Sequence, residues 1–225
     1  AFTTFRNGNA DVYVMNADGR GEAVPVLATP ADEWIEDWSK DGKFIAYKMG
    51  QDASLDLYVA PVEPDLKVGK PLVIAQGKYQ KDEAQFSYDG KWLAYGSDES
   101  STFQVYIVSL PELKKHQVTP PEGGGQPRWR SDGKELYYRA FDNRAMAVDI
   151  TLGATASSGI PHQLFVGANV GPARDPARHQ WSAASDGKKF LVRLPNNSGT
   201  SGGNRGGGPV APLNFNAAAA TDGAA

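Results

Sequence analysis

The chain has 225 residues, of which 40% are hydrophobic, and its 23 basic and 26 acidic side chains give a formal net charge of −3. These values suit one repeat array or two small domains with a buried core, and they provide no overall attraction to nucleic acid. The lack of cysteine excludes disulfides and thiolate metal sites, and no apolar run reaches the roughly 18 residues of a membrane-spanning helix.

The first 28 residues read as the end of a repeat unit. Residues 11–15 alternate as a strand does, and 16–19 are typical of a turn. In the next two units the corresponding strand begins 15 residues after an Asp-Gly pair, but no such pair precedes Asp11. We therefore expect the chain to begin inside a partial blade and to be part of something longer.

A motif made of an aromatic residue, an Asp-Gly-Lys turn and an apolar strand then occurs four times. Its copies start at Trp38, Phe86, Trp129 and Trp181, the last one stretched by two residues, and their Asp-Gly pairs lie 48, 43 and 54 residues apart. This spacing matches a four-stranded propeller blade of roughly 40–50 residues. Gly42 is expected to give the first hairpin its positive φ. We expect the four aromatic residues to share one blade position and to pack between blades, in preference to a sugar-stacking ring.

The apolar residues on both faces of the strand after each turn predict a sheet packed between two other sheets. The predicted fold is therefore all-β: a β-propeller of four-stranded antiparallel blades, with about four and a half blades present as a partial propeller or a five-bladed ring. The expected parts are a leading partial blade at 1–28, blades at about 34–75, 84–119, 127–166 and 179–195, a Gly/Ser/Asn-rich flexible segment at 196–208, a closing strand at 209–216 and a disordered tail at 217–225.

The repeats resemble those of TolB-like β-propellers, which are bacterial relatives of WD-type blades. Residues 38–47 with 56–59, and again 86–95, carry this family's pattern of aromatic-Ser-x-Asp-Gly-Lys-x-x-Ala-Tyr followed by an Asp-x-Tyr-Val strand. The order at 125–138, 146–149 and 186–192 resembles the C-terminal blades of larger multidomain bacterial proteins. The resemblance implies a propeller of about six or more blades. The kinase or DNA-binding domain of such proteins is not in this sequence, so neither activity is carried over.

Candidate binding residues lie where the last strand of one blade leads into the first strand of the next, because loops on a rigid scaffold commonly carry function. These connections are predicted at 29–36, 76–85, 119–128 and 167–180. The binding-face candidates on them are Trp34, Glu36, Tyr79, Glu83, Gln126, Arg128, Arg178 and His179. Acidic loops on one side and basic loops on the other favour a peptide or protein surface, and solvated loop charge is the alternative.

No catalytic residue, cofactor or metal site is predicted. The acidic run at 32–37 lacks the spacing of a calcium loop, and the three histidines show no zinc pattern. Residues 199–203 match G-x-S-x-G, but a nucleophile elbow requires a strand before it and a helix after it, and the sequence predicts neither.

We therefore expect a non-enzymatic, protein- or peptide-binding propeller module, periplasmic or extracellular, although a cytoplasmic location also fits a chain without cysteine. Neither nucleic acid binding nor membrane insertion is expected, and open blade edges would allow self-association. Two alternatives stay open. One is the substrate-gating propeller of a prolyl oligopeptidase-like hydrolase whose catalytic domain is absent here, and the other is a structural subunit of an extracellular assembly.

Overall fold

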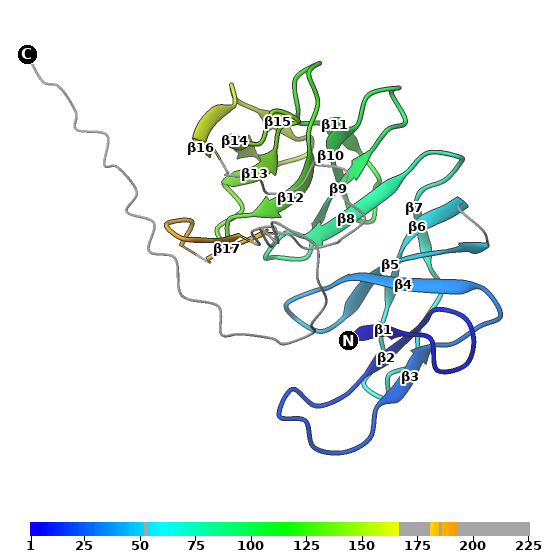
Figure 1. Ribbon diagram of the computed structural model, residues 1–225. Coiled ribbons are helices and arrows are strands. Elements are labelled where there is room, and N and C mark those ends of the chain that lie inside the picture. The colour runs from blue at the N-terminus through cyan, green and yellow to red at the C-terminus, as the bar shows by residue number, and fades with distance from the viewer. Residues whose placement is uncertain (52–53, 167–180, 185, 193–225) are drawn as a thin grey trace, which may run out of the picture.

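The computed structural model describes residues 1–51, 54–166, 181–184 and 186–192. All regular secondary structure in these segments is β, in antiparallel sheets that follow one another in chain order. Figure 1 shows the sheets arranged side by side around a common axis, with β4, β8, β12 and β17 innermost. The predicted all-β propeller of four-stranded antiparallel blades is thus confirmed.

A three-stranded sheet, here called the leading sheet, begins the chain. It consists of β1 (Phe2–Thr4), β2 (Asp11–Val14) and β3 (Val24–Leu27), in that order. Its contact with the following blade includes a hydrogen bond from the Ile35 amide to Thr3 Oγ1 at 3.1 Å. In the described part of the chain, β1 pairs with β2 alone, so its other edge carries no strand.

Three blades and a hairpin follow. The first blade contains β4 (Asp32–Trp38), β5 (Phe44–Gln51), β6 (Ser54–Pro61) and β7 (Leu72–Ala75). The second contains β8 (Lys81–Phe86), β9 (Trp92–Ser97), β10 (Gln104–Ser109) and β11 (Lys115–Gln117). The third contains β12 (Gly125–Trp129), β13 (Glu135–Arg139) and β14 (Arg144–Thr151), whose outer edge is shared by β15 (Ser157–Ser158) and β16 (His162–Val166). The last hairpin pairs β17 (Trp181–Ala183) with β18 (Phe190–Val192).

Each Asp-Gly turn satisfies its own polar groups. In the first blade, Asp41 Oδ1 accepts hydrogen bonds from Ser39 Oγ at 2.7 Å and from the Lys43 amide at 3.1 Å. The Gly42 amide donates to Ser39 O at 2.9 Å, and Gly42 has a φ of 74°, where a side chain would be strained. The second blade repeats these bonds with Ser87 and Asp89, so the turns are structural.

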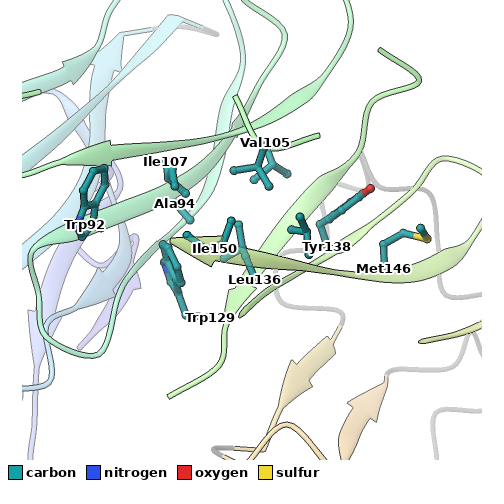
Figure 2. Packing of buried hydrophobic residues seen from close by; sticks show 11 residues of the cluster. Trp92, Ala94, Val105, Ile107, Trp129, Leu136, Tyr138, Met146 and Ile150 are labelled. Atoms are coloured by element: carbon teal, nitrogen blue, oxygen red, sulfur yellow. The ribbon is translucent and has the colours of Figure 1, made fainter. Parts of the chain in front are cut away.

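The core lies between the blades. Figure 2 shows the contact between the second and third blades, where Trp92, Ala94 and Ile107 face side chains that include Trp129 and Leu136. Every residue of β9 and β10 is buried, on both faces. This is the expected result of stacking one sheet between two others, and removal of one such large side chain typically costs about 2–5 kcal/mol.

The described sheets form an arc and do not close into a ring. Of the two predicted arrangements, the described blades therefore correspond to a partial propeller. The predicted segments at 196–208, 209–216 and 217–225 lie outside the described residues.

Two sequence-based expectations are wrong. Trp181 does not share the position of Trp38, because the last hairpin is not stretched: Ala183 pairs with Phe190 where Trp38 pairs with Ile45. Trp181 therefore lies two residues earlier along its strand. The inner strands also begin earlier than predicted, so each of the connections predicted at 29–36, 76–85 and 119–128 includes strand residues, of β4, β8 and β12 respectively.

Candidate binding face

The blades expose two different ends. One end, the turn face, carries the Asp-Gly hairpins at 39–43, 87–91 and 130–134. The other end, the loop face, carries the connections at 5–10, 28–31, 76–80, 98–103, 118–124 and 140–143. Hydrogen bonds join neighbouring loops on this face, such as the Gln80 amide to Asp98 Oδ1 at 2.7 Å and the Gly124 amide to Phe103 O at 3.0 Å. The loop face is therefore one connected surface.

Exposed aromatic side chains stand on the loop face. Phe5, Tyr79 and Phe141 are 58%, 47% and 40% exposed, and they come from the leading sheet, the entry to the second blade and the third blade. The Phe5 ring meets Trp34 edge-on, with centroids 5.4 Å apart. Gly77, at a φ of 113°, lies under the Tyr79 ring, where an added Cβ would come within 3.2 Å of Tyr79 Cε2. Aromatic rings that are held in place but exposed are common anchors of protein interfaces.

Beneath this face, the inner strands hold buried ion pairs. Arg128 Nη2 donates to Glu83 Oε2 at 2.8 Å, and Arg128 Nε donates to Trp181 O at 3.1 Å. Both partners are buried, so the pair links β8, β12 and β17 around the axis. A charged pair at this depth is stable only when both ends are hydrogen-bonded.

Two lysines complete this polar layer. Lys48 Nζ lies 3.4 Å from Glu36 Oε1 and also contacts Asp82 Oδ1. Lys81 Nζ is fully buried and donates to Asp56 Oδ1 and Leu55 O, each at 3.2 Å, and to a further carbonyl in the 76–80 loop. These cations tie the first blade to the second.

Several inner-strand carboxyl groups are hard to ionise. Burial raises the pKa of Glu33 above its ordinary value of 4.5, although hydrogen bonds from Thr29 act in the opposite direction. Burial likewise raises the pKa of Glu83, against the charge of Arg128. Burial also raises the pKa of Asp37, which accepts a hydrogen bond from the Phe86 amide at 2.9 Å.

A bulge interrupts the inner strands β4, β8 and β12 at corresponding places. The register shifts between Ile35 and Asp37, between Asp82 and Gln85, and between Gly125 and Arg128. At these bulges Glu83 and Gln126 adopt φ values of 55° and 56°. Positive φ is unfavourable for these side chains, and bulges redirect side chains next to binding sites. Both Gln126 amide atoms are buried and form no hydrogen bond.

The structure separates the predicted candidates into two groups. Glu36, Glu83, Gln126 and Arg128 are buried on inner strands and not exposed on loops, because the strands start early and the bulges turn these side chains inward. Trp34 is half-buried on β4 beside Phe5, and Tyr79 is exposed on the loop face. Arg178 and His179 lie outside the described residues.

Sequence reasoning missed the second-strand cation Lys48 and the exposed rings of Phe5 and Phe141. Lys48 and Arg139 both stand seven residues after the aspartate of an Asp-Gly pair, so the repeat itself contained this signal. Phe5 and Phe141 lie in turns between a second and a third strand, where a lone aromatic residue gives no periodic pattern.

The described residues contain no group of three or more His, Asp or Glu side chains placed to hold a metal ion. No helix in the described segments is long and apolar enough to cross a membrane. The loop face therefore offers exposed aromatic rings that are supported by a layer of buried ion pairs.

No family model matches this chain. A curated relative, an uncharacterised protein of Agrobacterium fabrum, is 21% identical over 136 residues, which cover 60% of this chain and 44% of that protein. The chain thus spans less than half of the length of this relative.

Solved structures of propellers are similar to this chain. A putative TolB from Agrobacterium tumefaciens has a TM-score of 0.55 at 19% identity, covering 69% of this chain and 58% of that one. A puromycin-hydrolysing peptidase of Mycobacterium tuberculosis has a TM-score of 0.53 at 19% identity, covering 63% and 24%. The periplasmic gluconolactonase of Pseudomonas aeruginosa has a TM-score of 0.51 at 16% identity, covering 80% and 55%.

These likenesses include a putative TolB and agree with the blade order, the hairpins and the inner strands described above. The chain therefore has the fold of a TolB-like β-propeller.

Proposed function

We propose that this chain is a non-enzymatic propeller module that binds a protein or peptide through its loop face. The observation that carries the proposal is the set of exposed rings of Phe5, Tyr79 and Phe141, which extend from the leading sheet to the third blade over buried ion pairs. Their partner would be an extended or loop-shaped polypeptide with apolar side chains, since aromatic anchors fill or receive such groups. A periplasmic or extracellular location is part of this proposal, in keeping with the name of one of the similar structures, a periplasmic gluconolactonase.

The test uses a library of random peptides displayed on phage, selected against the full chain. Peptides that are selected should bind the purified wild-type chain and lose affinity to Tyr79→Ala and to Phe141→Ala. The matched control is Tyr88→Ala, because Tyr88 is 61% exposed but lies on the turn face. Equal loss with Tyr88→Ala, or no loss with either loop-face variant, would count against the loop face as the binding surface.

The second candidate function is the substrate-gating propeller of a hydrolase. The likeness to the puromycin-hydrolysing peptidase favours it, although this chain covers 24% of that protein. If the chain gates access to a hydrolase, the full-length parent should cleave short proline-containing peptides, and Tyr79→Ala in the parent should change which peptide lengths are cleaved. A parent without any hydrolase activity would remove this alternative.

A further inference from the structure

The turn face carries a cavity between the second and third blades. Its volume is about 280 Å³, and its walls are the turn residues 87–89 and 131–133 together with Leu152. Leu152 packs against the core cluster that joins these two blades, so it gives the cavity an apolar wall that rests on the core. All of the wall residues belong to the second and third blades. We call this cavity the turn pocket.

The turn pocket is a departure from the repeat. An added Cβ on Gly90 would lie 4.0 Å from the preceding turn, and one on Gly187 would lie 3.1 Å from the turn before it. At Gly133 the nearest atom is instead Leu152 Cδ1, at 3.9 Å and in the same blade. No atom of the preceding described turn lies within 4 Å of that position. The third turn therefore stands apart from the second, and the pocket lies between them.

The wall of this pocket includes a carboxylate without an ion pair. In the first turn, Asp41 pairs with Lys43 at 3.7 Å. In the third turn, Asp132 accepts from Arg130 Nε at 2.8 Å and from Arg130 Nη2 at 2.9 Å. Asp89 closes its turn with hydrogen bonds at 2.7 and 3.1 Å, as Asp41 does, but no cationic side chain of the described residues lies within 4 Å of its carboxylate. A charge that the protein itself does not neutralise thus lines the pocket.

An exposed ring stands next to this carboxylate. Tyr88 is 61% exposed and lines the pocket, whereas the same turn position holds Lys40 in the first blade and Ser131 in the third. The pocket therefore combines an aromatic ring, an aliphatic side chain and a carboxylate. An arginine side chain suits all three, because its guanidinium group stacks on aromatic rings and pairs with carboxylates while its methylene groups pack on apolar surface.

We propose that the turn pocket binds the arginine side chain of a partner polypeptide. The guanidinium group donates to the Asp89 carboxylate and lies against the Tyr88 ring, and the methylene groups contact Leu152. This site lies at the opposite end of the blades from the loop face, and it does not rest on the function proposed for that face.

The size and charge of the pocket favour a side chain over a small molecule. Sites for drug-sized ligands commonly measure roughly 300–1,000 Å³, and this pocket is smaller. None of its wall residues is basic, so the carboxylate of free arginine would meet Asp89 and Asp132 without a cation to balance it. An arginine within a polypeptide lacks that carboxylate and is the better ligand.

The probe is the capped tripeptide acetyl-Gly-Arg-Gly-amide, titrated into the ¹⁵N-labelled full chain. The amide resonances of residues 87–91 and 130–134 should move to saturation in ¹H–¹⁵N spectra. The same peptide with citrulline in place of arginine has nearly the same shape but no charge, and it should bind about fivefold more weakly. Free arginine should also bind more weakly than the capped peptide, because its carboxylate is repelled.

Asp89→Asn and Tyr88→Ala should each weaken binding of the arginine peptide about fivefold. Asparagine keeps the oxygen that accepts the bonds within the turn, so the hairpin should stay closed. The matched control is Asp41→Asn, because Asp41 holds the same place in the first turn, away from the pocket, and its change should leave the affinity as it is. Tyr79→Ala on the loop face should also leave it unchanged, the reverse of the result expected for a peptide bound there.

Three results would overturn the proposal: no saturable shift in the wild-type chain, equal affinity for the citrulline peptide, or equal losses in Asp89→Asn and Asp41→Asn. The last would mean that the peptide responds to the overall charge of the protein and not to this pocket. Free arginine that binds more tightly than the capped peptide would also overturn it, since the ligand would then be a small molecule.

Discussion

Arg128 on β12 donates to Glu83 on β8 at 2.8 Å, and the two side chains are 6% and 5% exposed. This pair joins the second and third blades at the axis, and the same arginine reaches the carbonyl of Trp181. The inner strands, which carry the bulges and the positive φ values, are thus held together by side-chain bonds.

Removal of one member of this pair should be strongly destabilising. Arg128→Ala leaves the Glu83 carboxyl buried without its cation, and we expect the free energy of unfolding to fall by about 3–5 kcal/mol in guanidinium titrations. Lys43→Ala is the control, because its pair with Asp41 spans 3.7 Å with the lysine side chain 73% exposed, and it should change stability by about 0.5 kcal/mol or less. Similar losses of stability in both variants would contradict the conclusion that the buried pair holds the inner strands together.

Glu33 should make stability depend on pH. Burial, with the charges of Asp11 and Asp32 adding to it, raises the pKa of Glu33 above 4.5. Between 4.5 and the raised pKa, the folded state binds more protons than the unfolded state, so this group's contribution to stability falls as the pH rises through that window. Glu33→Gln lacks this effect. Its unfolding free energy relative to wild type should therefore increase from acid to neutral pH in urea titrations, and a constant difference would contradict the assignment.

Two tryptophans at one repeat position should respond differently to the same change. Trp38→Phe removes a buried donor that has no acceptor, so thermal unfolding should shift little or slightly upward. Trp129→Phe removes a donor that is bonded to Gln85 O and should lower the free energy of unfolding by about 1 kcal/mol. The two differ in the indole partner, so equal effects would mean that the bond to Gln85 contributes nothing.

Replacement of Gln126 by glycine should stabilise the protein. Its φ of 56° is unfavourable for any residue with a Cβ, and its side-chain amide forms no hydrogen bond. Gln126→Gly should raise the free energy of unfolding by about 1 kcal/mol. Gln104→Gly is the contrasting change, because Gln104 accepts a hydrogen bond from Thr119 at 2.5 Å on a regular strand, and it should be destabilising.

The repeated motif is enough to predict the blades, because the Asp-Gly turn and the apolar strand after it depend on residues that are close in the sequence. The position of Trp181 was wrong because its alignment followed the aromatic residue, whereas the cross-strand register follows the turn, which places Ala183 opposite Phe190. The spacing of residues in the sequence is thus a reliable guide to structure where the hydrogen bonds join residues that are a few positions apart.

The candidate site could be predicted only in part. The predicted connections correctly include Tyr79, which lies in a loop between blades, but they also include Glu83 and Gln126, which are buried on strands. Their burial depends on bulges and on partners 45 and 55 residues away along the chain, such as Arg128 and Trp181. Contacts of this range leave no periodic trace in a single sequence.

The Asp-Gly turns bond within themselves, while the contacts between inner strands join equivalent positions of successive blades. A duplicated copy of one unit would therefore arrive with its turn complete and its neighbour's bonding groups already in register. Evolution can lengthen or shorten such an array by whole blades without changing either kind of contact. The array of blades described above is built from units that can be added or removed in this way.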